Sequence, residues 1–203
     1  MTAKTHPSKA TAASGGFAAI PLNAHFAARV EGLDLRVPFT PVQIVDFAAL
    51  IDRYGVLVVP GQAFTDEEQV GFAEQFGRVE DTPTLVDQGR RRLANMKIND
   101  ISNLAADGQI FDREDRRRMY NLGNMLWHSD SSFKPTPAKY SMLHARVIPP
   151  TGGETEYVDT RVAWEELPQA MKDTVKDLVT EHSLIFSRAQ LGFDVFTAEE
   201  QQR

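Results

Sequence analysis

The sequence predicts a mixed α/β protein, mainly β, in which two N-terminal helices pack beside a mostly antiparallel β body. Two amphipathic segments with N-terminal capping signals lie within residues 40–77, and a short apolar run separates them. From residue 125 the pattern changes to short β-like segments, separated by proline and glycine. Together these observations predict one α/β core.

The two helices are predicted from their first turns. Thr40-Pro41 places an N-cap threonine before a proline at the first helical position, and apolar residues follow at helical spacing. Thr65 and Glu68 have the spacing of a capping box, and Gly77 stands where a helix C′ residue is expected. A third helix is expected to begin at Pro168.

The strands are predicted from short apolar or alternating runs between turn residues. They are expected at residues 17–22, 28–35, 56–59 (as a buried strand), 96–104, 139–148, 154–160 and 181–186.

The two ends of the chain carry separate expectations. Residues 1–16 are small and polar without an apolar stretch, which predicts a disordered leader, and residues 17–203 are expected to form a partial domain. Thr197 and Glu200 form a capping box with almost no helix after it. This pattern suggests that the chain stops before its domain does, although a frayed polar tail would look the same.

Composition narrows the class of protein. The 203 residues have a net charge of −6, which argues against nucleic acid or an anionic membrane as a partner. The absence of cysteine excludes disulfides, thiolate zinc sites and a cysteine nucleophile. No apolar run approaches the roughly 18–20 residues of a membrane span. These features fit a cytoplasmic protein and leave a homo-oligomer open.

The candidate chemistry lies in Trp127-His128-Ser129-Asp130. In an extended segment, side chains two residues apart point the same way, so His128 and Asp130 can reach one divalent ion. They would supply two of the three ligands of the 2-His-1-carboxylate triad that binds Fe(II). His-x-Asp alone is a weak pattern, and local hydrogen bonding in a turn is the other interpretation.

The surrounding motifs favour the metal. The string WHSDSSF is followed by a proline-rich stretch, KYSMLHARVIPP and TGGETEY, and it is preceded by HFAARVEGLDLR and VLVVPGQAFTDEEQVGFAEQFG. In this order the motifs resemble the taurine/2,4-dichlorophenoxyacetate family of Fe(II)/2-oxoglutarate-dependent dioxygenases, over roughly residues 20–203. The resemblance implies a double-stranded β-helix, a cupin-like jelly roll, incomplete at its C-terminus.

The resemblance also assigns residues. His128 and Asp130 would be iron ligands, and the Thr155 hydroxyl would hydrogen-bond a carboxylate of 2-oxoglutarate. The implied reaction consumes dioxygen and 2-oxoglutarate and hydroxylates a small organic acid, an aryloxyalkanoate or a sulfonate. The family's second iron histidine and its 2-oxoglutarate arginine are expected beyond residue 203, so this chain alone is expected to bind iron poorly, to be inactive and to leave apolar faces exposed.

Other polar residues receive weaker assignments. His144 and His182 are expected to be packed or hydrogen-bonded rather than ligands. Gln109 stands where herbicide-degrading members carry a lysine, which puts a phenoxyacetate substrate in doubt. The arginine runs 90–92 and 116–118 are interpreted as surface charge rather than as attractors for an anionic substrate.

Two other functions remain open. One is a non-catalytic short β-fold binding protein, or the partner of a full-length homologue. The other is a Zn or Mn hydrolase that uses His128 and Asp130. Succinate production that requires both Fe(II) and oxygen would distinguish the dioxygenase from either alternative.

Overall fold

The computed structural model describes residues 11–12, 15–81, 92–192 and 196–202, which form two compact units. One unit combines Met1–Arg78 with His144–Leu178, and the other combines Val79–Leu143 with Val179–Arg203. Within the described residues, no helix combines the length and the apolar character needed to cross a bilayer.

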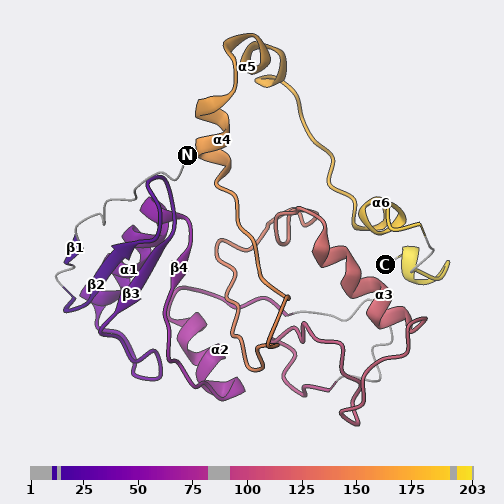
Figure 1. The fold of residues 1–203 in the computed structure, drawn as a ribbon, viewed down its shortest axis with the longest axis horizontal. Coiled ribbons are helices and arrows are strands. Elements are labelled where there is room, and N and C mark those ends of the chain that lie inside the picture. Colours follow the sequence, from indigo (N-terminus) through magenta and orange to yellow (C-terminus); the bar gives the residue numbers. More distant parts are fainter. Residues whose placement is uncertain (1–10, 13–14, 82–91, 193–195, 203) are drawn as a thin grey trace. The chain divides into compact units, whose positions relative to one another are not determined.

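The first unit is built on a four-stranded sheet with the strand order β1-β2-β3-β4 (Figure 1). β1–β2 and β2–β3 pair antiparallel, whereas β3–β4 pair parallel. The strands are β1 (Thr11–Ala12), β2 (Ala18–Pro21), β3 (Ala28–Glu31) and β4 (Leu57–Val58). Strands expected at 17–22, 28–35 and 56–59 are therefore confirmed, although in shorter form, and Val58 is exposed rather than buried.

The first helix, α1 (Pro41–Tyr54), begins as its sequence predicts. The Thr40 side chain accepts a hydrogen bond from the Gln43 backbone N–H, and the Gln43 side chain caps the Thr40 N–H in return. The helix ends at Gly55, whose φ of 71° is readily adopted only by glycine. Its buried face carries Phe47, Leu50 and Tyr54.

The second helix, α2 (Asp66–Glu74), begins at the expected capping box of Thr65 and Glu68. Its Phe72 packs edge-on against Phe39 and Phe47, with ring centroids 5.1 and 5.9 Å apart. These rings join the apolar residues of β2 and β3 in one core, which holds the sheet against α1 and α2.

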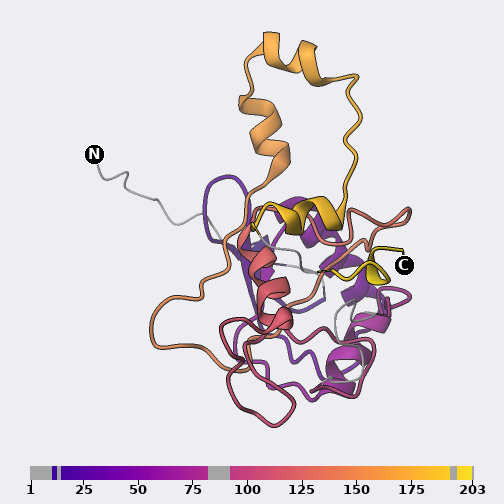
Figure 2. The same ribbon diagram turned by 90° about the vertical axis from the view of Figure 1, so that its right-hand side faces the viewer.

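Two further helices of the same unit are α4 (Thr160–Glu166) and α5 (Gln169–Val175), of which only α5 was predicted. Asp159 caps α4, and Arg161 donates from Nη1 to the Asp52 carbonyl at the end of α1, at 2.5 Å. Figure 2 shows α4 and α5 as separate helices.

The second unit contains α3 (Arg116–Leu122), the 3-10 turn η2 (Gly123–Met125), α6 (Leu184–Ala189) and η3 (Glu200–Gln202). α6 packs on α3 and η2 through Arg188, which lies over the Tyr120 ring at 4.8 Å. η3 begins at the expected capping box of Thr197 and Glu200.

Several predicted strands are wrong. Residues 96–104 form turns. The Asn95 side chain accepts a hydrogen bond from the Lys97 backbone N–H, which is then not available to pair with a neighbouring strand. Residues 181–186 run into α6, because Ser183 caps a helix at Phe186. Across 139–148 and 154–160 no strand forms, since no segment among the described residues supplies ladder partners there. The described fold is therefore α/β with more helix than strand, rather than mainly β.

The expected leader is only partly covered by the structure. Residues 1–10, 13 and 14 lie outside the described residues. Thr11–Ala12 form β1, and the Gly15 N–H donates to Asp46 Oδ2 at 2.8 Å. The boundary between leader and domain stays a prediction.

Candidate metal centre

His128 and Asp130 follow directly on η2, in a segment that becomes extended at Leu126. His128 Nε2 lies 3.3 Å from Asp130 Oδ1, and the two side chains are 40% and 58% exposed. The i, i+2 spacing therefore brings imidazole and carboxylate together at an accessible position.

The hydrogen bond at Nδ1 fixes which nitrogen of the His128 ring is left to bind a metal. Nδ1 lies 2.6 Å from the Leu126 carbonyl oxygen, and because a carbonyl only accepts, Nδ1 donates. Nε2 faces the Asp130 carboxylate, with which it forms an ion pair when the ring is protonated. When Nε2 is unprotonated, its lone pair and the carboxylate oxygen lie close enough to bind the same cation. A hydrogen bond from the distal nitrogen is also the arrangement of most metal-bound histidines. The pair therefore fits a divalent metal.

The described residues supply only these two donors at this position. No group of three His, Asp or Glu side chains that could hold a metal occurs in the part of the chain that the structure describes. His144 is packed as expected, donating from Nε2 to the Gln62 carbonyl at 3.2 Å with its ring against Phe64. His182 is exposed just before α6.

Thr155 belongs to the other compact unit. It is exposed in an irregular segment after Gly152 and Gly153, whose φ angles of 73° and 77° are typical of glycine. Its assignment to 2-oxoglutarate stays a prediction.

A tight turn follows Asp130. Ser131 has a φ of 56°, a left-handed conformation that is uncommon for a residue with a Cβ. The turn closes through the Lys134 N–H, which donates to the Ser131 carbonyl at 2.9 Å.

Glu80 contacts both ends of this turn. Its Oε2 accepts from Lys134 Nζ at 2.6 Å and from Ser131 Oγ at 3.1 Å. The hydrogen bond from Lys134, followed by that from Ser131, lowers the pKa of Glu80 despite some opposing desolvation. Sequence reasoning missed this residue, because an acid and a lysine 54 positions apart carry no local signal.

The described members of the two arginine runs are engaged locally, whereas Arg90 and Arg91 lie outside the described residues. Arg117 pairs with Asp115 at 2.7 Å, and Arg116 pairs with Glu200 at 2.5 Å. Arg92 pairs with Asp100 at 2.7 Å. These ion pairs support a structural role over capture of an anionic substrate. Gln109 is exposed in a turn beside the isolated Leu104–Ile110 bridge.

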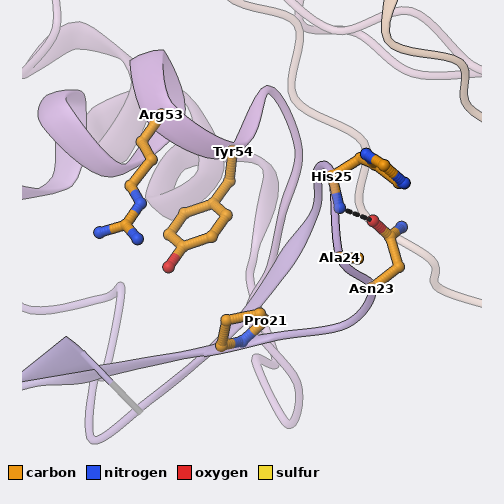
Figure 3. A pocket seen from close by; sticks show the side chains of 6 residues that line it. All are labelled: Pro21, Asn23, Ala24, His25, Arg53 and Tyr54. Carbon is orange, nitrogen blue, oxygen red and sulfur yellow. Dashed lines mark hydrogen bonds between the residues drawn. The ribbon is translucent and has the colours of Figure 1, made fainter. Parts of the chain in front are cut away.

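A separate small cavity of about 220 Å³ lies at the end of α1 (Figure 3). It is lined by Pro21, Asn23, Ala24, His25, Arg53 and Tyr54. The His25 ring points away from Tyr54 in this view, and the Tyr54 hydroxyl is buried. None of the lining residues is a predicted ligand.

The family model described as "Taurine catabolism dioxygenase TauD, TfdA family" matches residues 18–202. The chain belongs to the TauD/TfdA family. The predicted resemblance is thereby confirmed, and the family implies a cupin-like fold.

The relatives of the chain include dioxygenases that depend on alpha-ketoglutarate. The chain is 40% identical over 172 residues to the alpha-ketoglutarate-dependent 2,4-dichlorophenoxyacetate dioxygenase of Cupriavidus pinatubonensis, covering 85% of this chain and 60% of that protein. It is 33% identical to the (S)-phenoxypropionate/alpha-ketoglutarate-dioxygenase of Sphingobium herbicidovorans, covering 92% and 60%. The chain thus spans about 60% of the length of these curated relatives.

A solved structure of similar fold is that of AAD-2 in complex with Mn(II) and N-oxalylglycine. The sequences are 46% identical and the TM-score is 0.86, over 92% of this chain and 65% of AAD-2. The described fold is therefore similar to that of the corresponding part of AAD-2.

Proposed function

We propose that the protein is an Fe(II)/2-oxoglutarate-dependent dioxygenase that hydroxylates a small organic acid of the aryloxyalkanoate or sulfonate class. The observation that carries this proposal is the convergence of His128 Nε2 and Asp130 Oδ1 to 3.3 Å in a TauD/TfdA chain. The substrates named for the relatives, 2,4-dichlorophenoxyacetate and phenoxypropionate, support the aryloxyalkanoate class.

Each residue would have a defined part. His128 binds the metal through Nε2 while the Leu126 carbonyl holds its ring in place, and Asp130 contributes the negative ligand. The Thr155 hydroxyl donates a hydrogen bond to a carboxylate of 2-oxoglutarate. When bound, iron and 2-oxoglutarate would supply an oxidant able to remove hydrogen from a C–H bond of the substrate. The reaction consumes dioxygen and converts 2-oxoglutarate to succinate and carbon dioxide.

The product follows from where the hydroxyl group is added. Hydroxylation of a carbon bonded to an ether oxygen gives a hemiacetal, whose C–O bond then breaks to release an alcohol or phenol and a carbonyl compound. With a sulfonate, hydroxylation beside sulfur leads to C–S cleavage. Gln109 would hydrogen-bond a substrate rather than neutralise it, which weakens the case for phenoxyacetate itself.

The remaining family features belong to the same proposal. The complete protein would form a double-stranded β-helix, with residues 17–203 as part of the dioxygenase domain. It would act in the cytoplasm on a small molecule and dioxygen, without a nucleic acid or membrane partner. A crystal structure of the complete gene product, read to its own stop codon, tests the β-helix.

Activity is tested on that complete gene product. Succinate release is measured with Fe(II), 2-oxoglutarate and oxygen across a panel of aryloxyalkanoates and sulfonates. The His128→Ala variant is expected to release no succinate, whereas His182→Ala, at an exposed histidine, is expected to keep normal turnover. Full turnover by His128→Ala, or turnover without 2-oxoglutarate, would disprove the proposal.

A further inference from the structure

We propose that Glu80 is a positioning residue for the metal pair, because it anchors the turn that directly follows Asp130 in the chain. The inference rests on the proposed function, since it takes His128 and Asp130 to be metal ligands. It assigns a role to a carboxylate that lies 48 residues before His128 in the sequence.

The first step is the backbone after Asp130. Ser131 sits at φ 56°, an uncommon conformation for a residue with a Cβ that persists only where surrounding contacts enforce it. If Ser131 relaxed to a negative φ, the direction of the chain after Asp130 would change. The segment that carries His128 and Asp130 would then shift relative to the rest of its unit.

The second step is what enforces the turn. One carboxylate oxygen of Glu80 accepts from the Ser131 hydroxyl at 3.1 Å and from the Lys134 ammonium at 2.6 Å. Glu80 therefore contacts the first and last residues of the turn at once. The Glu80 and Lys134 side chains are only 29% and 31% exposed, so solvent screens the pair less than it would on an open surface.

Few other contacts hold the His128–Asp130 pair in place. Within the described residues, the Asp130 carboxylate has one partner, His128 Nε2. The His128 ring is held by Leu126, on the other side of the pair. The place of the pair in its unit thus depends on how the adjacent turn is anchored, and Glu80 anchors that turn. Groups outside the coordination shell that hold metal ligands in place typically change metal affinity by 10–100-fold when mutated.

The experiment measures Mn(II) affinity of the complete gene product by electron paramagnetic resonance titration. Glu80→Ala is expected to weaken Mn(II) binding by about 10–100-fold. Glu114→Ala removes the same charge at an exposed site of the same unit and is the matched control, with unchanged affinity expected. Glu80→Gln keeps the side-chain shape and an acceptor, so a smaller loss is expected.

Rescue separates positioning from loss of fold. In the Glu80→Ala background, Ser131→Gly is expected to restore part of the Mn(II) affinity, because glycine adopts the left-handed conformation without enforcement. Equal affinity for Glu80→Ala and Glu114→Ala would overturn the inference. So would a loss in Glu80→Ala that Ser131→Gly leaves unchanged.

His128→Ala distinguishes this inference from the proposed function. If His128→Ala binds Mn(II) like the unmodified protein, the metal assignment itself fails. If His128→Ala loses binding while Glu80→Ala does not, only the role of Glu80 fails.

Discussion

In the N-terminal region, residues 17–76, buried phenylalanine rings pack against one another, whereas many large apolar side chains of the later region, residues 141–189, face solvent. Phe72 of α2 is 3% exposed and touches several other phenylalanine rings. Val147 and Val179, in contrast, are 86% and 96% exposed. The apolar side chains of the two regions therefore differ in how far they are packed.

Strands and helices differ in where their backbone hydrogen-bond partners come from. A helix satisfies its backbone hydrogen bonds within itself, so α1 and α2 form where capping and apolar spacing favour them. A strand needs a neighbouring strand for the same purpose. Residues 139–148 and 154–160 have strand-like composition, but the described residues offer them no ladder.

The largest expected effect tests the contrast in packing directly. Phe72→Ala should lower the free energy of unfolding by about 3–5 kcal/mol, because it leaves a cavity among tightly packed rings. Val147→Ala should change it by less than about 0.5 kcal/mol, since that side chain is already in solvent. Denaturant unfolding of the 203-residue chain measures both variants. A cost for Val147→Ala close to that of Phe72→Ala would remove the contrast.

A smaller effect is expected at the contact between η2 and α6. A Cβ added at Gly123 would clash with the guanidinium of Arg188, which is 8% exposed. Gly123→Ala should therefore cost about 1–3 kcal/mol. Gly71→Ala in α2 meets open space and should instead stabilise the protein by about 0.5–1 kcal/mol.

Thermal and denaturant unfolding measure these two glycine variants. In an Arg188→Ala background, Gly123→Ala should lower the free energy of unfolding much less, because the guanidinium with which the added Cβ would clash is absent. An equal cost in both backgrounds would show that Gly123 is not constrained by Arg188.

The smallest expected effect is a pH dependence at the start of α4. The hydrogen bond from the Arg161 side chain lowers the pKa of Asp159, outweighing desolvation. A carboxyl with a lowered folded-state pKa contributes stability that is present above its unfolded pKa of about 4 and is lost as pH falls through the folded value. Asp159→Asn should therefore lose stability at pH 7 and show a flatter decline below pH 4.

Arg161→Met provides the matching test, because it removes the other half of the pair. Its stability-versus-pH curve should flatten like that of Asp159→Asn, and the double variant should add little to either. Independent, additive effects would show that the two side chains do not act together.

Part of the candidate site could be predicted from the sequence. The approach of His128 and Asp130 follows from two-residue spacing in an extended segment, which the structure reproduces. The capping boxes at Thr40, Thr65 and Thr197 were predictable for the same reason, since cap and partner lie three residues apart. The apolar run at 184–186 was misread because short runs suit either a strand or a helix, and the Ser183 cap decides for the helix.

The sequence by itself determined the family, the capped helices and the pairing of His128 with Asp130, because each depends on residues close together in the chain or on motifs in a fixed order. Tertiary structure alone decided three contacts: the hydrogen bond from Lys134 to Glu80 at the turn after Asp130, the packing of Arg188 against Gly123, and the hydrogen bond from Arg161 of α4 to the end of α1. Those contacts join residues separated by tens of positions, and only folding brings such residues together.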